Sequence, residues 1–240
     1  MLDKTSGTSL YAQLADLLRK QIQGHQLLPD TQLPSERELC EQHAISRITV
    51  RKAMDELLHE GLVYTCVGKG TYVAEPKLSE ELQPFSSFTE DMQRRGMAVS
   101  SQVLESALVP CDDFLAARLH VPRGAEVINL HRLRLADGLP IAIQRTCVPH
   151  HLCPDLLQYD FSLRSLLDVL RTEYRLKLAR ADTSIEAALA RFDEIRLLQL
   201  SSPAAVLISE QTTYLDSGVV IEWTRSVFRG DRYRLHTHTR

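Results

Sequence analysis

Near the start of the chain, apolar residues recur at every third or fourth position, the spacing of one helix face. Residues 10–23 carry leucine or isoleucine at this spacing and are predicted to be a helix that ends at Gly24. A second helix is predicted after Ser35, because Ser35 and Glu38 have the S-x-x-E spacing of a capping box. A third helix is predicted after Ser46. Its predicted buried face comprises Val50, Ala53, Met54, Leu57 and Leu58.

The pattern changes after this third helix. Residues 62–67 and 71–74 are rich in β-branched and aromatic side chains and are predicted to be two short strands. The turn Gly68-Lys69-Gly70 joins them, which predicts a hairpin. A phosphate-binding nucleotide loop is the competing interpretation of these glycines. Such a loop opens a helix, whereas this turn lies between two strands.

Beyond residue 85 the pattern predicts short helices and long strands. Helices are predicted at residues 85–95, 112–119, 162–174 and 191–198, and strands at residues 99–109, 127–135, 139–147, 180–187, 206–215 and 219–228. Asp137-Gly138 and Asp216-Ser217-Gly218 are typical hairpin turns. The order of elements predicts an α+β domain with a mainly antiparallel sheet. The helix at residues 162–174 is predicted to bury Leu163, Leu166, Leu167 and Leu170.

The composition, 44% hydrophobic and 25% charged, is ordinary for a globular protein, and 240 residues suffice for two domains. No apolar run approaches the roughly 18 residues that span a bilayer. Residues 1–6 lack the apolar core of a signal peptide, so we expect a cytoplasmic protein with no membrane partner. The five cysteines are odd in number and scattered, which indicates no disulfide framework.

A net charge of −3 argues against a protein that coats nucleic acid through bulk charge. Cations nevertheless gather locally, because residues 46–54 contain Arg47, Arg51 and Lys52 and no carboxylate. A second helix with polar and basic residues at its N-terminal end is typical of a helix-turn-helix that enters the major groove. The hairpin behind it is typical of a wing, whose tip Lys69 can reach a minor groove. The alternative is an ordinary helical hairpin with a solvated basic face.

Residues 1–75 resemble the DNA-binding domain of the GntR family of bacterial transcription regulators. The matching residues are Leu10-Tyr11-x-Gln13, Leu33-Pro34-Ser35-Glu36-Arg37-x-Leu39, Ser46-Arg47-x-Thr49-Val50-Arg51-x-Ala53 and Gly68-Lys69-Gly70-Thr71-Tyr72-Val73. One departure is Asp30, where the family usually has glycine. The resemblance implies that Arg37, Arg47, Thr49, Arg51 and the wing glycines Gly68 and Gly70 touch the operator. The full set of DNA-binding candidates also includes Ser46, Lys52 and Lys69.

Within this set, Arg47 or Arg51 is expected to read a guanine edge, while Arg37 and Thr49 lie partly on phosphate. The alternative is that every cation contacts phosphate only, which would give affinity without sequence choice.

The rest of the chain resembles the effector-binding UTRA domain of the HutC subfamily. Its marks are Phe88-Thr89-Glu90-Asp91-Met92, Arg132-x-Arg134-x-x-Asp137-Gly138-x-Pro140-Ile141-Ala142, Glu222-Trp223-x-Arg225-Ser226 and Arg229-Gly230-Asp231-Arg232-Tyr233. The resemblance implies a winged helix-turn-helix in residues 1–75, a linker in residues 76–84, and a UTRA effector-binding and dimerisation domain in residues 85–240. Such domains resemble the chorismate lyase fold and bind small polar effectors, often sugar phosphates or related anions.

Arg132 and Arg134 stand two apart on a predicted strand, so both side chains point to the same face. Two guanidinium groups facing a pocket would clamp a phosphate or carboxylate. The alternative is a basic stripe on a solvated sheet face. The full set of pocket candidates is Phe88, Arg132, Arg134, Gln144, Ser162, Arg164, Glu222 and Tyr233.

Two candidates depart from the family pattern. Gln144 stands where relatives commonly have glutamate, and Arg164 replaces the tyrosine of a Ser-Leu-Tyr motif that begins at Ser162. The hypothesis is an effector that is more anionic, or poorer in donors, than the usual amino-sugar phosphate. Two structural alternatives remain: Ser162 caps a helix, and Glu222 pairs with a nearby arginine.

The sequence gives no support for catalysis or for a metal. His150-His151-x-Cys153 lacks a second cluster at metal-ligand spacing, so neither a metal nor a cofactor is expected. No nucleophile, base and acid stand in a convincing arrangement. The prediction is a dimeric, ligand-responsive transcription factor, a repressor on a palindromic double-stranded operator. Two rival classes are an enzyme that turns over the ligand and an architectural DNA-binding protein without an effector.

Overall fold

The computed structural model describes residues 2–3, 6–66, 68–74, 78–81 and 87–236. The chain divides into two compact units, Met1–Pro76 and Lys77–Arg240, and each is described by itself. No helix in the described segments is both long enough and apolar enough to cross a membrane.

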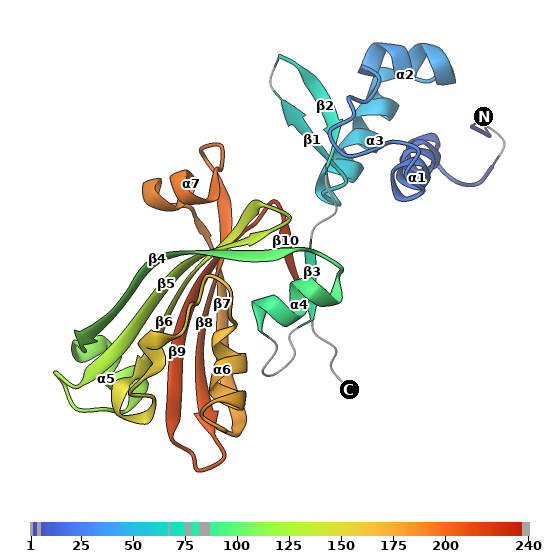
Figure 1. Ribbon diagram of the computed structural model, residues 1–240. Coiled ribbons are helices and arrows are strands. Elements are labelled where there is room, and N and C mark those ends of the chain that lie inside the picture. The colour runs from blue at the N-terminus through green and yellow to red at the C-terminus, as the bar shows by residue number, and fades with distance from the viewer. Residues whose placement is uncertain (1, 4–5, 67, 75–77, 82–86, 237–240) are drawn as a thin grey trace. The chain divides into compact units, whose positions relative to one another are not determined.

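The first unit consists of three helices and a hairpin (Figure 1). Its elements are α1 (Leu10–Gln23), α2 (Glu36–His43), α3 (Arg47–His59), β1 (Val63–Cys66) and β2 (Gly70–Val73). The predicted helix at residues 10–23 and the predicted capping box of Ser35 and Glu38 are both confirmed. Arg19 holds α1 to α3, because its guanidinium donates to the carboxylates of Glu56 and Glu60.

The hairpin is anchored to the connector that precedes α2. The backbone N–H of Asp30 donates to Val73 O at 2.9 Å, and that of Leu33 donates to Thr71 O at 2.8 Å. Asp30 adopts a left-handed conformation with φ of 60°, which aspartate tolerates better than most residues. Its carboxylate accepts from the Tyr64 hydroxyl at 2.8 Å, and this bond raises the pKa of Tyr64 to about 12. Asp30 thus replaces the usual glycine and also fixes β1.

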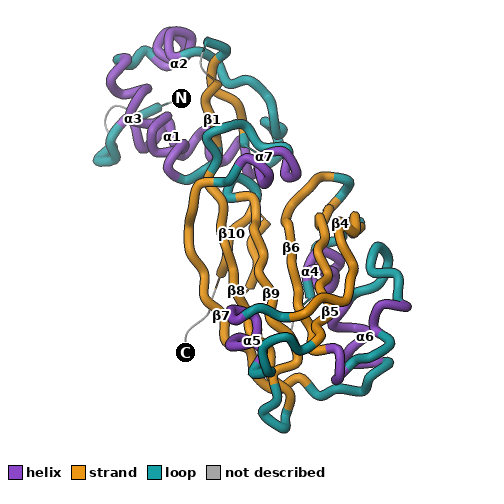
Figure 2. The backbone as a smooth tube through the Cα atoms, turned by 90° about the vertical axis from the view of Figure 1, so that its left-hand side faces the viewer, coloured by secondary structure: helices purple, strands orange, loops and turns teal. Residues whose placement is uncertain are grey.

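The second unit is built on a six-stranded antiparallel sheet in the order β4-β5-β6-β9-β8-β7, confirming the α+β prediction. Figure 2 shows these long strands running side by side. The strands are β4 (Val99–Pro110), β5 (Glu126–Ala136), β6 (Leu139–Pro149), β7 (Leu178–Leu189), β8 (Ala205–Leu215) and β9 (Val220–Arg229). The helices are α4 (Phe88–Arg94), α5 (Asp113–Leu119), the short 3₁₀ turns η1 (His150–Leu152) and η2 (Leu156–Gln158), α6 (Leu166–Thr172) and α7 (Phe192–Leu198).

Helices cover both faces of this sheet. On one face, α6 packs on Ile128 and Leu130 of β5, and α4 packs on Ala142 of β6. On the other face, α5 packs beside Trp223, and α7 packs beside Val227. The polar site described below lies on the face that carries α4 and α6.

The helix predicted at residues 162–174 starts later than expected, at Leu166. Ser165 is its N-cap, and the Ser165 side chain accepts from the backbone N–H of Asp168. Ser162 does not cap a helix, because its hydroxyl donates to Asp160 at 2.6 Å. Leu163 is 83% exposed, so the prediction that it is buried was wrong, whereas Leu166 is buried as expected.

Two short strands were not predicted. β3 (Leu78–Glu81) pairs in parallel with β10 (Tyr233–His236), and the register joins Leu78 to Tyr233. β3 falls inside the predicted linker, so part of that segment is a strand of the second unit. Residues 75–77 and 82–86 lie outside the described segments.

Leu163 and Leu166 provide a matched test of the corrected helix start. Leu166→Ala is expected to lower the free energy of unfolding by about 2–5 kcal/mol, because a buried side chain leaves a cavity. Leu163→Ala is expected to change it by less than about 0.5 kcal/mol, as for an exposed position. Urea unfolding followed by the fluorescence of Trp223, the single tryptophan, reports on this unit. Equal losses in the two variants would contradict the start at Leu166.

Candidate DNA-binding surface and effector cavity

The N-terminal turn of α3 is fixed by its own cap. Ser46 Oγ accepts from the backbone N–H of Thr49 at 3.2 Å, and the two hydroxyl oxygens are 2.8 Å apart. This cap satisfies one of the free N–H groups at the helix start. The cap holds the first turn of α3, and the side chain of Arg47 projects from this turn into solvent.

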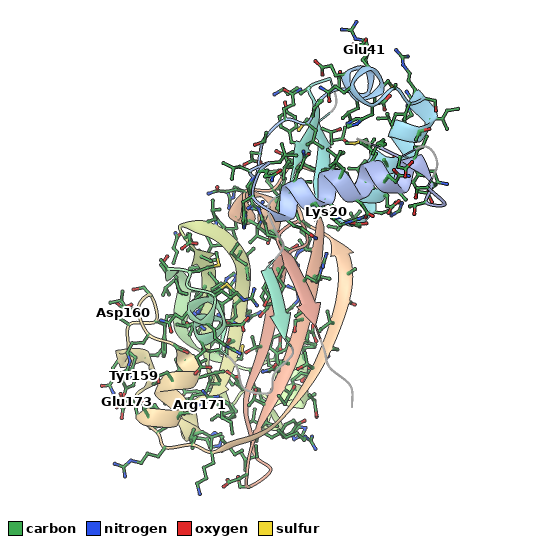
Figure 3. The ribbon with its side chains drawn as sticks, turned by 90° about the vertical axis from the view of Figure 1, so that its right-hand side faces the viewer. Lys20, Glu41, Tyr159, Asp160, Arg171 and Glu173 are labelled. Carbon is green, nitrogen blue, oxygen red and sulfur yellow. The ribbon has the colours of Figure 1, made fainter. Side chains whose placement is uncertain are left out.

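The exposed cations of this unit differ in their partners. Arg51 Nε donates to both carboxylate oxygens of Glu36, at 3.1 and 3.0 Å, which leaves its two terminal NH₂ groups for another acceptor. Lys52 Nζ lies 3.9 Å from the centre of the Tyr11 ring, a cation–π contact. Arg37 Nε lies 3.8 Å from the carboxylate of Glu41; Figure 3 labels Glu41 on α2.

Within the described residues, the side chains of Arg47 and Lys69 form no ion pair. Both are exposed, Arg47 at the start of α3 and Lys69 in the turn of the hairpin. Neither cation is therefore compensated by an ion pair with a described residue of the protein itself. This arrangement agrees with the local, rather than global, placement of positive charge that the sequence indicated.

The two glycines of the hairpin turn have separate roles. Gly68 has φ of 75° with open space around it, so it permits a backbone conformation that other residues rarely adopt. Gly70 has φ of 117°, and a Cβ atom there would lie 2.8 Å from Gln32 Nε2. Gln32 Nε2 in turn donates to Lys69 O at 2.8 Å. The Gln32 contact holds the turn at Lys69, and the positive φ favours glycine at position 70.

In the second unit, a cavity of about 110 Å³ lies over the middle of the sheet. Six of the eight predicted pocket residues line it: Phe88, Arg132, Arg134, Gln144, Glu222 and Tyr233. Ser87, Ser165, Leu166, Leu167 and Leu235 complete the wall from α4, α6 and β10, and Phe228 adds an aromatic side chain from β9.

Most of the remaining lining residues carry hydroxyl or amide groups and were not predicted. Together with Arg132 and Gln144, these residues form two rows of cross-strand partners on neighbouring strands. The rows are Arg132–Gln144–Ser226–Ser209 and Thr146–Thr224–Gln211–Thr183. The strands β5, β6, β8 and β9 therefore each contribute polar side chains two residues apart to the same face, and β7 contributes Thr183. That alternation is visible in the sequence at Ser209 and Gln211 and again at Thr224 and Ser226.

Arg132 is the most deeply buried cation of the cavity, with 2% of its surface exposed. One Nη donates to the Gln144 amide oxygen at 2.9 Å, and the guanidinium lies 5.8 Å from the centre of the Phe161 ring. Its Nε and other Nη are buried without a partner among the described residues. Burial, and next the like charge of Arg134, lower the pKa of Arg132, and Glu222 opposes this effect.

Arg134 is 3% exposed and reaches from the sheet to α4. Its guanidinium donates to the Thr89 hydroxyl at 2.8 Å and lies 4.8 Å from the centre of the Phe88 ring. Its Nε has no partner within the described residues. Burial lowers the pKa of Arg134 to about 10, so the side chain is still a cation at neutral pH. Two poorly compensated cations therefore face one cavity.

Glu222 is the only carboxylate among the residues that line the cavity in the described structure. It accepts from the Thr213 hydroxyl at 3.0 Å, and no ion pair with an arginine forms within 4.0 Å among the described residues. Burial raises its pKa, whereas the Thr213 hydrogen bond and the charge of Arg132 act in the opposite direction. A carboxyl group with a raised pKa compensates the arginines less than an ordinary carboxylate would.

Ser162 and Arg164 do not reach the cavity. Arg164 donates to Glu173 at 2.8 Å and lies 5.3 Å from the centre of the Tyr159 ring. Figure 3 labels Tyr159, Asp160 and Glu173 beside one another, away from the sheet. The predictions that Ser162 and Arg164 line the pocket therefore receive no support from the geometry. Ser165, three residues on from Ser162, lines the cavity instead.

The His150-His151-x-Cys153 segment has other partners. The ring of His150 contacts the Pro154 carbonyl and the Glu126 carboxylate, while Cys153 is buried in the core under α6. Burial raises the pKa of the Cys153 thiol to about 12, which keeps it protonated. Within the described residues, no group of three or more His, Cys, Asp or Glu side chains is arranged to hold a metal ion.

Comparison with known proteins agrees with this architecture. The family described as "Bacterial regulatory proteins, gntR family" matches residues 10–73, and the UTRA domain matches residues 94–234. The chain belongs to the gntR family of regulators that carry a UTRA domain. Members are DNA-binding transcription regulators and not enzymes, so the enzyme alternative is dropped and the first unit is assigned to DNA binding.

Similar proteins cover nearly the whole chain. The HTH-type transcriptional repressor NagR of Bacillus subtilis is 38% identical over 97% of this chain and 95% of its own length. The mannosyl-D-glycerate transport/metabolism system repressor MngR of Escherichia coli is 30% identical over 94% of this chain and 93% of its own. The crystal structure of PhnF from Mycobacterium smegmatis aligns with a TM-score of 0.69 and 29% identity, covering 94% of this chain and 98% of that one.

Arg47 offers a direct test of the DNA-binding surface. Because its cation has no ion pair within the described residues, Arg47→Ala is expected to weaken operator binding roughly ten- to hundredfold, the effect of losing one base contact. Fluorescence anisotropy can be measured on a duplex that the full-length protein selects from a random library. Arg123→Ala removes the same charge from an exposed position in the second unit and should change little. Equal weakening in both variants would contradict the assignment.

Proposed function

We propose that this regulator is a repressor whose operator binding is controlled by a small anionic metabolite in the UTRA cavity. The observation that carries the proposal is the pair Arg132 and Arg134, both nearly unexposed, with N–H donors that lack acceptors within the described residues. Each unsatisfied buried donor costs about 1–3 kcal/mol. A phosphate or carboxylate supplies both the acceptors and the missing negative charge.

Gln144 strengthens the preference for an anion. Its amide oxygen accepts from Arg132, and its amide nitrogen lies 3.4 Å from Ser226 Oγ. A glutamate at this position would neutralise Arg132, whereas the amide keeps the hydrogen bond and leaves the positive charge uncompensated. Arg164 adds nothing to this preference, because Glu173 and Asp168 compensate it outside the cavity.

The rows of hydroxyl and amide groups support a polyhydroxylated or otherwise polar body for the effector. Ser209, Gln211, Thr224 and Ser226 offer both donors and acceptors beside the arginines. A sugar phosphate or a small hydroxylated carboxylate has matching groups. The relatives include repressors named for mannosyl-D-glycerate transport and for histidine utilization, so the family accommodates different metabolites and does not by itself identify this one.

Binding is proposed to move the walls of the cavity. Its volume of about 110 Å³ is below the roughly 300–1,000 Å³ of typical small-molecule sites, and we propose that α4 and α6 separate to admit a whole metabolite. These helices are joined by an ion pair between Glu90 of α4 and Arg171 of α6, at 2.9 Å. Figure 3 labels Arg171. A separation of α4 from α6 would lengthen this ion pair between Glu90 and Arg171.

β10 offers a route from the cavity to the DNA-binding unit. Tyr233 and Leu235 of β10 line the cavity, and β10 pairs with β3, the first element after the division at Pro76. A shift of β10 therefore pulls on the segment that leads to the winged helix. The protein then has a conformation that binds the operator and one that does not. For the effector to release DNA, its affinity must be higher for the conformation that does not bind the operator.

The proposed assembly is a homodimer in the cytoplasm, with two winged helices on the half-sites of a palindromic operator. The two-fold symmetry of a dimer matches the symmetry of such a site. In a dimer, a small effector-driven change in the segment that joins the two units would alter the spacing between the two α3 helices. Operator binding at both half-sites would then change together.

Calorimetric titration against phosphorylated sugars and small carboxylates tests the proposal. An anion from this panel is expected to bind the full-length protein, and Arg132→Gln is expected to weaken it roughly ten- to hundredfold by removing a charge-assisted bond. Arg164→Gln is the matched control, because that side chain lies outside the cavity, and it should bind normally. Tight binding of a neutral or cationic metabolite would refute the anion preference. Unchanged operator affinity across the whole panel would favour an effector-independent architectural protein.

A further inference from the structure

α3 presents one large apolar side chain to solvent at its N-terminal turn. Ile48, the second residue of the helix, is 81% exposed. Four other apolar side chains of α3 are buried, and Leu58 near its C-terminal end is 37% exposed. The buried ones are Val50, Ala53, Met54 and Leu57. Single exposed apolar residues are common and need no function by themselves. The position of Ile48 between two expected DNA contacts, Arg47 and Thr49, is the feature that calls for an explanation.

The neighbours of Ile48 on the helix leave it uncovered. Arg51 and Lys52 lie three and four residues on and share its face. Arg51 donates to Glu36 of α2, and Lys52 lies over the ring of Tyr11 in α1. The two cations are therefore fixed to different helices. The Thr49 hydroxyl is engaged with Ser46, which leaves the branched hydrocarbon of Ile48 as the apolar group at the groove-entering end.

We propose that Ile48 is a specificity-determining residue that packs against the 5-methyl group of a thymine in each half-site. In the major groove, thymine is the standard base that presents a methyl group, and apolar side chains recognise it by direct contact. The cations beside Ile48 supply affinity and hydrogen bonds, whereas Ile48 supplies a preference that charge cannot give. The proposal rests on the DNA-binding function of this unit and adds the base that this residue reads.

Deoxyuridine provides a test that removes one methyl group and nothing else. The full-length protein selects a duplex from a random library, and each thymine of that duplex is then replaced in turn by deoxyuridine. One replacement in a single half-site is expected to weaken binding by the wild-type protein about fourfold, the effect of losing one buried methyl group. Ile48→Ala is expected to bind the original duplex more weakly and to lose sensitivity to that same replacement.

Controls separate the possible failures. Ile48 is exposed and alanine favours helices, so the Ile48→Ala variant should keep its fold, which circular dichroism checks. Leu58→Ala removes an apolar side chain from the far end of α3 and should retain the full sensitivity to deoxyuridine. If no sequence is enriched from the library, the DNA-binding function itself fails, and the proposal fails with it. Tight binding with no sensitive thymine, or equal sensitivity in wild type and Ile48→Ala, overturns the proposal alone.

Discussion

Arg132 and Arg134 are buried side by side on one sheet face, and three of their nitrogens have no acceptor within the described residues. A folded protein usually avoids this arrangement, because buried cations without partners oppose folding. Here the surroundings keep the arginines uncompensated: Gln144 supplies an amide instead of a carboxylate, and burial raises the pKa of Glu222. These buried donors without acceptors are consistent with a site that a bound anion completes. The proposed preference for an anion, the proposed separation of α4 from α6 and the proposed role of β10 all depend on these unpaired arginine donors.

The cations of the DNA-binding unit differ from the buried arginines of the cavity, because they are exposed. Binding DNA requires that they be oriented rather than neutralised. Glu36 holds Arg51 through Nε while leaving its terminal NH₂ groups available, and Gln32 holds the backbone at Lys69. The capping hydroxyl of Ser46 fixes the first turn of α3. Few residues are therefore needed for recognition, because each one is positioned by a contact within the unit. This explains how a chain with a net charge of −3 includes a unit that binds DNA.

Local signals in the sequence predicted the local structure well. The bounds of α1 and the capping box of α2 follow from spacing and from cap residues, and the common face of Arg132 and Arg134 follows from the two-residue period of a strand. The errors concern long-range pairing. The polar rows of the cavity depend on register between strands, and β3 with β10 joins segments far apart in the chain. Leu163 fits the helical period, yet the helix begins at the later serine, and Arg164 is compensated by Glu173, which no local pattern reveals.

We propose that the cavity beside Arg132 and Arg134 holds an anion and that the binding of this anion opposes operator binding. By linkage, an anion that releases DNA must itself bind more weakly to the DNA-bound protein, and by the same factor. The most direct measurement is the affinity of the best-binding anion for the full-length protein, by calorimetry, with and without a saturating operator duplex. The affinity for the anion is expected to be about 5- to 150-fold weaker in the presence of DNA, the usual range of allosteric coupling. The same affinity in both titrations would contradict it.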